Sequence, residues 1–213
     1  IGPFQRDARA AIGTIRTDAK ENLITAIEIA AAKDEHGMPM VPEVAVYFEY
    51  RLMRGNRTVK VHAERFEAFR SPNWPPLAEA GVHLRYDRAA ILPRRKTGLR
   101  VHTDLDDRVA VIRLLPGIRG AWVRHALSMP GLRAAVLTTF GSGNAPTDPE
   151  FLDALREARA RGLLLLNVTQ CVGGRVEQGR YATSEALVAM GVVPGADLTV
   201  EAALAKLMFL LAQ

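Results

Sequence analysis

The chain has 213 residues, a net charge of +5 and a hydrophobic content of 48%. These values are typical of a globular chain long enough to bury a sizeable core, in one domain or two smaller ones. Its apolar runs fall short of the roughly 18 residues that a membrane helix needs, so we expect no membrane partner. The first residue is Ile1, with no initiating Met and no signal-peptide pattern after it. We therefore expect either a fragment or a chain whose start has been removed.

The basic charge comes mainly from arginine, and the isoelectric point is about 9.7. Nucleic-acid binding is one interpretation of such a charge. However, the arginines are scattered among acidic residues and lack the interleaved aromatics of a stacking platform, so we favour a solvated surface. The five histidines are dispersed without metal-ligand spacing, and we expect no metal site. Cys171 stands alone, which excludes an intrachain disulfide and favours a reducing compartment.

Hydrophobic periodicity and turn residues predict the elements of the first half. In chain order we expect a helix near 18–32, a strand at 44–48, a turn at 53–57, a short strand around 58–61 and a strand at 82–85. Asp18 and Glu21 occupy capping positions at the start of the helix. Leu23, Ile24, Ile27 and Ala31 form its apolar stripe.

Residues 87–107 lose periodicity and gain charge, which predicts a linker in this part of the chain. We place a first domain at 1–92, the linker at 93–107 and a second domain at 108–213. The second domain alternates strands at 108–115, 132–138 and 163–168 with helices at 118–128, 148–161, 183–190 and 199–211. Apolar strands separated by helices predict an α/β fold with a parallel sheet buried on both faces.

Gly141, Gly143 and Asn144 follow the predicted strand at 132–138. A strand–turn–helix corner of this kind faces ligands in α/β proteins, and glycine lets backbone approach a ligand closely. A nucleotide is disfavoured, because the third glycine of G-x-G-x-x-G and the Gly-Lys-Ser/Thr end of a phosphate loop are both missing. Thr147 and Glu150 have the spacing of a capping box at the start of the next helix. We expect the corner to recognise a small polar ligand.

A second polar turn, at 167–174, follows the next strand of the predicted sheet. Adjacent parallel strands bring their carboxyl ends to one edge, so Thr169 and Gln170 are expected to lie near Asn144. The alternative is that these residues only support turn geometry. The residues themselves leave both interpretations open.

Lys60 is the candidate for chemistry in the first half, because it stands between Val59 and Val61 on a predicted strand. A half-buried lysine needs a carboxylate partner or its pKa falls, which suits a base. Strand alternation would instead place Lys60 on the solvent face. The pattern alone favours the solvent-facing interpretation.

Several blocks of sequence occur in a fixed order from about residue 12 to the end. They include Met53-Arg54-Gly55-Asn56-Arg57-Thr58-Val59-Lys60, Gly141-Ser142-Gly143-Asn144-Ala145-Pro146 and Asn167-Val168-Thr169-Gln170-Cys171. Together with Phe66–Asn73 and Gly195–Leu204, they resemble the cytoplasmic, type I bacterial L-asparaginases.

The resemblance implies hydrolysis of L-asparagine to L-aspartate and ammonia through an acyl-enzyme intermediate, without a cofactor. It implies a larger N-terminal α/β domain and a smaller C-terminal domain with a parallel sheet. It also implies a cytoplasmic homo-oligomer, a dimer or dimer of dimers, with active sites shared between subunits. Lys60 matches the family's catalytic lysine, and Asn144 and Tyr181 match substrate-binding residues supplied by the neighbouring subunit. Cys171 matches a segment linked with an allosteric site.

The chain also departs from the family pattern. The Thr-Gly-Gly-Thr-Ile and His-Gly-Thr-Asp motifs do not occur in it, so we expect the nucleophilic Thr in a missing N-terminal segment. Val59 and Thr138 stand where allosteric relatives carry Thr and Arg, which argues against allosteric control. Two alternatives remain. One is a non-catalytic relative that binds asparagine or aspartate, and the other is an asparaginase-like subunit of a tRNA-dependent amidotransferase, which would explain the basic charge.

Overall fold

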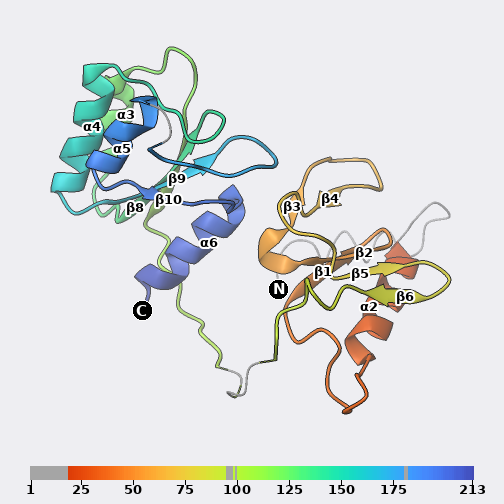
Figure 1. The fold of residues 1–213 in the computed structure, drawn as a ribbon. Helices are drawn as coiled ribbons and strands as arrows, with labels where there is room; N and C mark the ends of the chain where they lie inside the picture. The colour runs from red at the N-terminus through yellow and green to blue at the C-terminus, as the bar shows by residue number, and fades with distance from the viewer. Residues whose placement is uncertain (1–18, 95–97, 99, 180–181) are drawn as a thin grey trace. The chain divides into compact units, whose positions relative to one another are not determined.

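A computed structural model describes residues 19–94, 98, 100–179 and 182–213 (Figure 1). The chain divides into two compact units, Ile1–Leu99 and Arg100–Gln213. None of the helices in the described ranges is long and apolar enough to cross a membrane. Each unit contains helices and its own sheet, so the chain has a mixed α/β architecture.

The first unit is built on an antiparallel sheet with strand order β1-β2-β5-β6. Its elements are α2 (Ala19–Ala31), β1 (Ala45–Phe48), β2 (Arg51–Arg54), the short 3₁₀ helix η1 (Gly55–Arg57), β3 (Val59–Lys60), β4 (Phe69–Arg70), β5 (Ala78–Ala80) and β6 (Leu84–Tyr86). The strands β3 and β4 form a separate two-stranded ribbon. Leu52 and Leu77 lie in a small core under this sheet, together with Ile29 of α2.

Part of the sequence prediction for this unit is wrong. The strands at 44–48, 58–61 and 82–85 are confirmed as β1, β3 and β6, and the turn at 53–57 is confirmed over Gly55–Arg57 as η1. Its predicted start is wrong, because Met53 and Arg54 are buried residues of β2, a strand that was not predicted. A second turn was not predicted: it joins β1 to β2 at Glu49 and Tyr50, whose φ angles are 43° and 64°. A tight hairpin with two positive φ angles usually carries Asn or Gly, so Glu-Tyr gives no turn signal.

The helix near 18–32 is confirmed as α2, but its apolar stripe does not face the described core. Leu23, Ile24 and Ile27 are 50%, 56% and 60% exposed, whereas Ile29 is buried. The helix therefore turns a different face toward the described core than hydrophobicity alone predicts. Asp18 lies outside the described residues.

The second unit is a four-stranded parallel sheet with strand order β10-β9-β8-β7. Its elements are β7 (Val109–Arg113), α3 (Gly120–Leu127), β8 (Ala134–Thr139), α4 (Pro149–Ala160), β9 (Leu164–Thr169), α5 (Ala182–Ala189), β10 (Val193–Pro194) and α6 (Val200–Leu211). The predicted alternation of strands and helices is confirmed. The strand β10 is exposed and was not predicted, because its two residues are too few to show a pattern.

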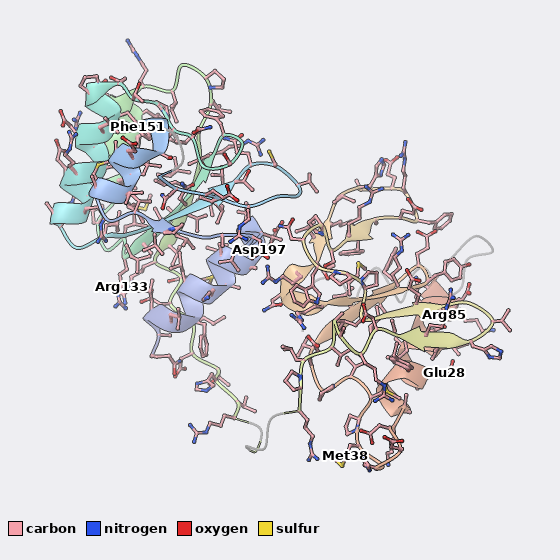
Figure 2. All side chains as sticks on the ribbon, viewed as in Figure 1. Glu28, Met38, Arg85, Arg133, Phe151 and Asp197 are labelled. Carbon is pink, nitrogen blue, oxygen red and sulfur yellow. The ribbon has the colours of Figure 1, made fainter. Side chains whose placement is uncertain are left out.

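Helices cover both faces of this sheet (Figure 1). Leu137 and Leu165 pack with α3, α4 and α5, including the fully buried Phe151 of α4 (Figure 2). Val136 and Leu166 point to the other face, where α6 covers them. Strands buried on both faces read as continuous apolar runs, which is the pattern that predicted this sheet.

The start of α4 differs from the prediction in one respect. Asp148, not Thr147, is the N-cap, and its carboxylate accepts hydrogen bonds from the backbone N–H groups of Glu150 and Phe151. Pro149 then occupies the first turn, where its missing N–H costs nothing. The capping-box interpretation of Thr147 and Glu150 is therefore wrong, because Asp-Pro places the helix start one residue later.

Asp106 ties the beginning of the second unit to its last helix. The carboxylate is largely buried and pairs with Arg108 and Arg133, each at 2.7 Å. Arg133 also donates to the carbonyl of Leu211, and the backbone N–H of Asp106 donates to the carbonyl of Met208. Hydrogen bonds from Arg108, and then from Arg133, hold the pKa of the Asp106 carboxyl far below its ordinary value of 3.8.

We expect the Asp106→Asn variant to unfold at a lower temperature than the wild type at pH 7. A depressed folded-state pKa stabilises the fold above the unfolded-state pKa, and this contribution is lost as pH falls through the folded-state value. The deficit should therefore shrink below about pH 3.8. Thermal unfolding from pH 7 to pH 2 measures it, with the exposed Asp104→Asn as the matched control. A deficit that stays constant across this range would contradict the prediction.

Candidate functional site

Lys60 is the last residue of β3 and lies opposite Phe69 of β4. Its side chain is exposed, with Nζ 5.8 Å from the centroid of the Phe69 ring. That ring packs at 5.0 Å from Phe48 of β1. The structure thus places Lys60 on the solvent-facing side, as strand alternation predicts, and the half-buried interpretation is wrong.

The corner after β8 is a closed backbone loop from Phe140 to Asn144. The backbone N–H of each of these two residues donates to the carbonyl of the other at 2.9 Å, and the Gly143 N–H donates to Phe140 at 3.0 Å. Gly141 and Gly143 have φ angles of 51° and 116°, which side chains rarely adopt. Glycine is therefore required by the turn itself, whether or not a ligand approaches. The loop leaves Asn144 half-buried at the carboxyl end of β8.

Side chains of β9 fix this corner from the neighbouring strand. The Thr169 hydroxyl donates to the Gly141 carbonyl at 2.5 Å. The fully buried Asn167 donates to the Gly143 carbonyl at 3.4 Å and accepts from the Thr139 hydroxyl at 2.7 Å. Buried polar groups paired in this way specify one arrangement of the loop, because any other arrangement leaves them without partners.

The predicted meeting of the two turns is confirmed, but the roles of their side chains differ. The Gln170 amide donates to the carbonyls of Leu114 at 2.6 Å and Thr138 at 2.9 Å. Thr169 also accepts from the N–H of Cys171 at 3.0 Å. Thr169 and Gln170 therefore bind backbone and support turn geometry. Ligand binding by Asn144 stays a prediction.

Two further predicted positions belong to the segment after β9. Cys171 is exposed at the start of this segment. The segment is joined to the corner, because the N–H of Glu177 donates to the carbonyl of Ser142 at 2.8 Å. Tyr181 lies outside the described residues. Among the residues that the structure does describe, no group of three His, Cys, Asp or Glu side chains is placed to hold a metal ion.

Sequence reasoning missed Asn167, which holds the corner from within the sheet. It interrupts the apolar run of 163–168, and a carboxamide at the centre of a buried strand signals a specific partner. It also missed Arg54, which is buried at the end of β2. An arginine directly after the apolar pair Leu52-Met53 carries the same signal.

Comparison with known families identifies the chain. The family model for the glutaminase/asparaginase C-terminal domain matches residues 108–213, and the model for the asparaginase N-terminal domain matches residues 8–92. The two matches stand in the order of a two-domain protein and fall on separate structural units. The chain belongs to the asparaginase family.

Two curated relatives, which carry different names, and one solved structure are similar to most of the chain. The chain is 44% identical to L-asparaginase 1 of Escherichia coli (strain K12) over 202 residues, which cover 95% of the chain and 58% of that protein. It is 42% identical to the 60 kDa lysophospholipase of Mus musculus over 97% of the chain and 35% of that protein. A crystal structure of L-asparaginase I from Vibrio cholerae matches with a TM-score of 0.82 and 39% identity, over 94% of the chain and 58% of that structure. The chain thus spans somewhat more than half the length of these asparaginases.

The corner yields a prediction that separates backbone strain from close packing. A Cβ at Gly143 would lie 2.8 Å from Val176 Cγ1 and 3.3 Å from Asn167 Nδ2, whereas a Cβ at Gly174 would meet no atom within 4 Å. Their φ angles are similar, 116° and 107°. Gly174→Ala should destabilise by about 1–3 kcal/mol through strain alone, and Gly143→Ala by about 1–3 kcal/mol more through overpacking.

Hydrogen exchange of the β8 and β9 amides in the intact chain measures this difference in the second unit. Equal losses of protection in the two variants would show that the corner tolerates a side chain at Gly143.

Proposed function

We propose that this chain forms part of an L-asparaginase, which hydrolyses L-asparagine to L-aspartate and ammonia without a cofactor. The observation that carries the proposal is 44% identity to an L-asparaginase over 95% of the chain. Both halves of the family pattern are matched, so the similarity is not limited to one shared domain.

In the proposed reaction, a threonine hydroxyl outside these 213 residues attacks the carboxamide carbon of asparagine. Ammonia leaves, and water then hydrolyses the acyl-enzyme. Lys60 is one of the residues that activate this hydroxyl. The assignment is supported by the match of the asparaginase N-terminal family model to residues 8–92, which include Lys60. Backbone N–H groups stabilise the oxyanion of the tetrahedral intermediate.

We further propose that Asn144 and Tyr181 contact the substrate from the neighbouring subunit of a homodimer or dimer of dimers, and that Cys171 belongs to a segment linked with an allosteric site. The rigid loop that carries Asn144 supports its role, since a binding residue must be held in place. The single, unpaired Cys171 supports a cytoplasmic location. The family matches at 8–92 and 108–213 support domains at 1–92 and 108–213 with a linker at 93–107.

The first test is ammonia release from L-asparagine and L-glutamine by the protein expressed from the whole reading frame. We expect turnover of L-asparagine and a Thr-Gly-Gly-Thr-Ile motif in the translated frame upstream of Ile1. Binding of asparagine without ammonia release would favour a non-catalytic relative. Turnover that depends on charged tRNA would favour an amidotransferase subunit.

Lys60→Met should lower kcat by about 10²–10⁴-fold, the usual contribution of a positioned proton-transfer group. Lys33→Met is the matched control, because Lys33 is also an exposed lysine of the first unit. Steady-state ammonia release gives both values. Turnover of Lys60→Met within a fewfold of wild type would remove Lys60 from the mechanism.

Asn144→Ala should raise KM for L-asparagine by about 10- to 100-fold, because a hydrogen bond to a charged ligand group contributes about 1.5–3 kcal/mol. Thr147→Ala, three residues away and exposed, serves as the control and should leave KM unchanged. An unchanged KM in Asn144→Ala would contradict the proposed contact with substrate.

A further inference from the structure

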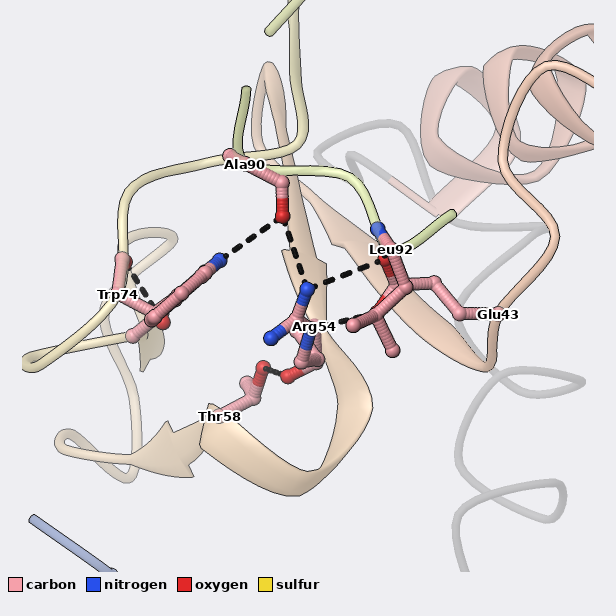
Figure 3. Close-up of polar contacts among 7 residues, drawn as sticks. Glu43, Arg54, Thr58, Trp74, Ala90 and Leu92 are labelled. Carbon is pink, nitrogen blue, oxygen red and sulfur yellow. Dashed lines mark hydrogen bonds and ion pairs between the residues drawn. The ribbon is translucent and has the colours of Figure 1, made fainter. Parts of the chain in front are cut away.

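Arg54, at the end of β2, forms a buried ion pair with Glu43 (Figure 3). Its Nε lies 2.5 Å from Glu43 Oε2, and the two side chains are only 10% and 7% exposed. A second guanidinium nitrogen lies 3.4 Å from Glu43 Oε1. Replacing a buried ion pair by apolar residues is often neutral or stabilising, so stability alone does not explain this pair.

Further groups hold the guanidinium in one orientation. Arg54 Nη2 donates to the carbonyl of Ala90 at 2.8 Å, and the guanidinium lies 4.5 Å from the centroid of the Trp74 ring. Trp74 Nε1 donates to the same carbonyl at 3.2 Å, while the Leu92 N–H donates to Glu43 at 2.8 Å. The planar, forked guanidinium meets a carboxylate, a carbonyl and an aromatic face together, which a lysine cannot reproduce.

The backbone of Arg54 leads directly to Lys60. Between them, η1 makes one tight turn, and the Thr58 hydroxyl closes it by donating to the Arg54 carbonyl at 2.7 Å. The turn is also fastened to the residue directly before β1, because the Gly55 N–H donates to the Val44 carbonyl at 2.9 Å. A Cβ at Gly55 would lie 3.0 Å from that carbonyl, so the two segments are packed closely.

This connection matters because the ribbon that carries Lys60 is small. Strands β3 and β4 have two residues each and lie outside the four-stranded sheet. A pair of strands this short does not define a position by itself, so its place depends on contacts outside the ribbon: the packing of Phe69 on Phe48 of β1 and the turn that leads from Arg54. Reaction rates, in contrast, respond to displacements of about 1 Å at a catalytic group.

We propose that the buried Arg54–Glu43 pair and the Thr58 hydroxyl form a positioning device. This device fixes the amine of Lys60 relative to the four-stranded antiparallel sheet of the first unit. The proposal rests on the role of Lys60 under Proposed function and adds positioning residues to it. Arg54, Glu43 and Thr58 act through Lys60 and do not touch the substrate. The device fixes the start of the turn through Arg54 and its end through Thr58.

Thr58→Val is the principal test, because it keeps the shape of the side chain and removes the hydrogen bond to Arg54. In the full-length enzyme, kcat for L-asparagine should fall by about 10- to 100-fold with KM within twofold, since geometry and not substrate binding is changed. Thr58→Ser restores the hydroxyl and should restore kcat. Ser128→Ala removes a similar hydroxyl-to-carbonyl bond, 2.8 Å to His125, and should leave kcat unchanged.

Arg54→Lys tests the other end of the device. Lysine retains the charge opposite Glu43 but lacks the planar, forked guanidinium that stacks on Trp74. We therefore expect kcat to fall at least as far as in Thr58→Val. Arg85→Lys, at an exposed position of β6 in the same unit, is its control (Figure 2). If Arg54→Lys fails to fold, Thr58→Val decides the question, because its bond is partly exposed.

A second measurement separates this proposal from the proposed function. Competitive labelling with acetic anhydride, followed by mass spectrometry, gives the reactivity of the Lys60 amine relative to Lys33 without any turnover. Thr58→Val should change this ratio at least twofold, and Thr58→Ser should not. Lys60→Met could retain activity while Thr58→Val still changes the Lys60-to-Lys33 reactivity ratio. That result would contradict the role of Lys60 in catalysis but support its positioning by the device. An unchanged ratio, or a changed ratio with unchanged kcat in an enzyme that requires Lys60, overturns the device.

Discussion

The constraint on which the second unit depends is the burial of its parallel sheet on both faces. Helices cover β8 and β9 from either side, so the strand ends emerge into a region where backbone groups must find partners within the protein. The side chains of Asn167, Thr169 and Gln170 provide them. The loop that carries Asn144 is therefore specified by the sheet, and a ligand-binding residue can be presented there without additional scaffolding.

Periodicity predicted the second unit well and the first unit poorly, for a physical reason. Parallel strands buried on both faces are apolar throughout, so Ala134–Thr139 and Leu164–Thr169 are visible in the sequence. The strands of the first unit have two to four residues, too few for a period to emerge. The positive φ angles at Glu49 and Tyr50 arise from the pairing of β1 with β2 and not from the residues in the turn.

The same difference holds for the candidate site. Gly141, Gly143 and Asn144 stand out because a strand, a turn and a helix follow one another in the sequence. Lys60 does not, since an exposed lysine on a short strand is ordinary by pattern, and only resemblance to a family gives it a role. Arg54 acts through partners 11 and 36 residues away, Glu43 and Ala90, and such contacts are visible only in the folded chain.

The Asp106 cluster has a mechanical consequence for the second unit. Asp106 precedes the first strand, and its carboxylate shares Arg133 with the carbonyl of Leu211 at the end of the last helix. Hydrogen bonds thus join the segment where the polypeptide enters the unit to the end of its final helix. A pulling force along residues 100–105 acts first on the bonds of Asp106 to Arg108 and Arg133, and only then on the hydrogen bonds between the strands. Motion of the preceding segment can then be absorbed at the edge of the unit while the loop of Asn144, at the opposite ends of the strands, keeps its geometry.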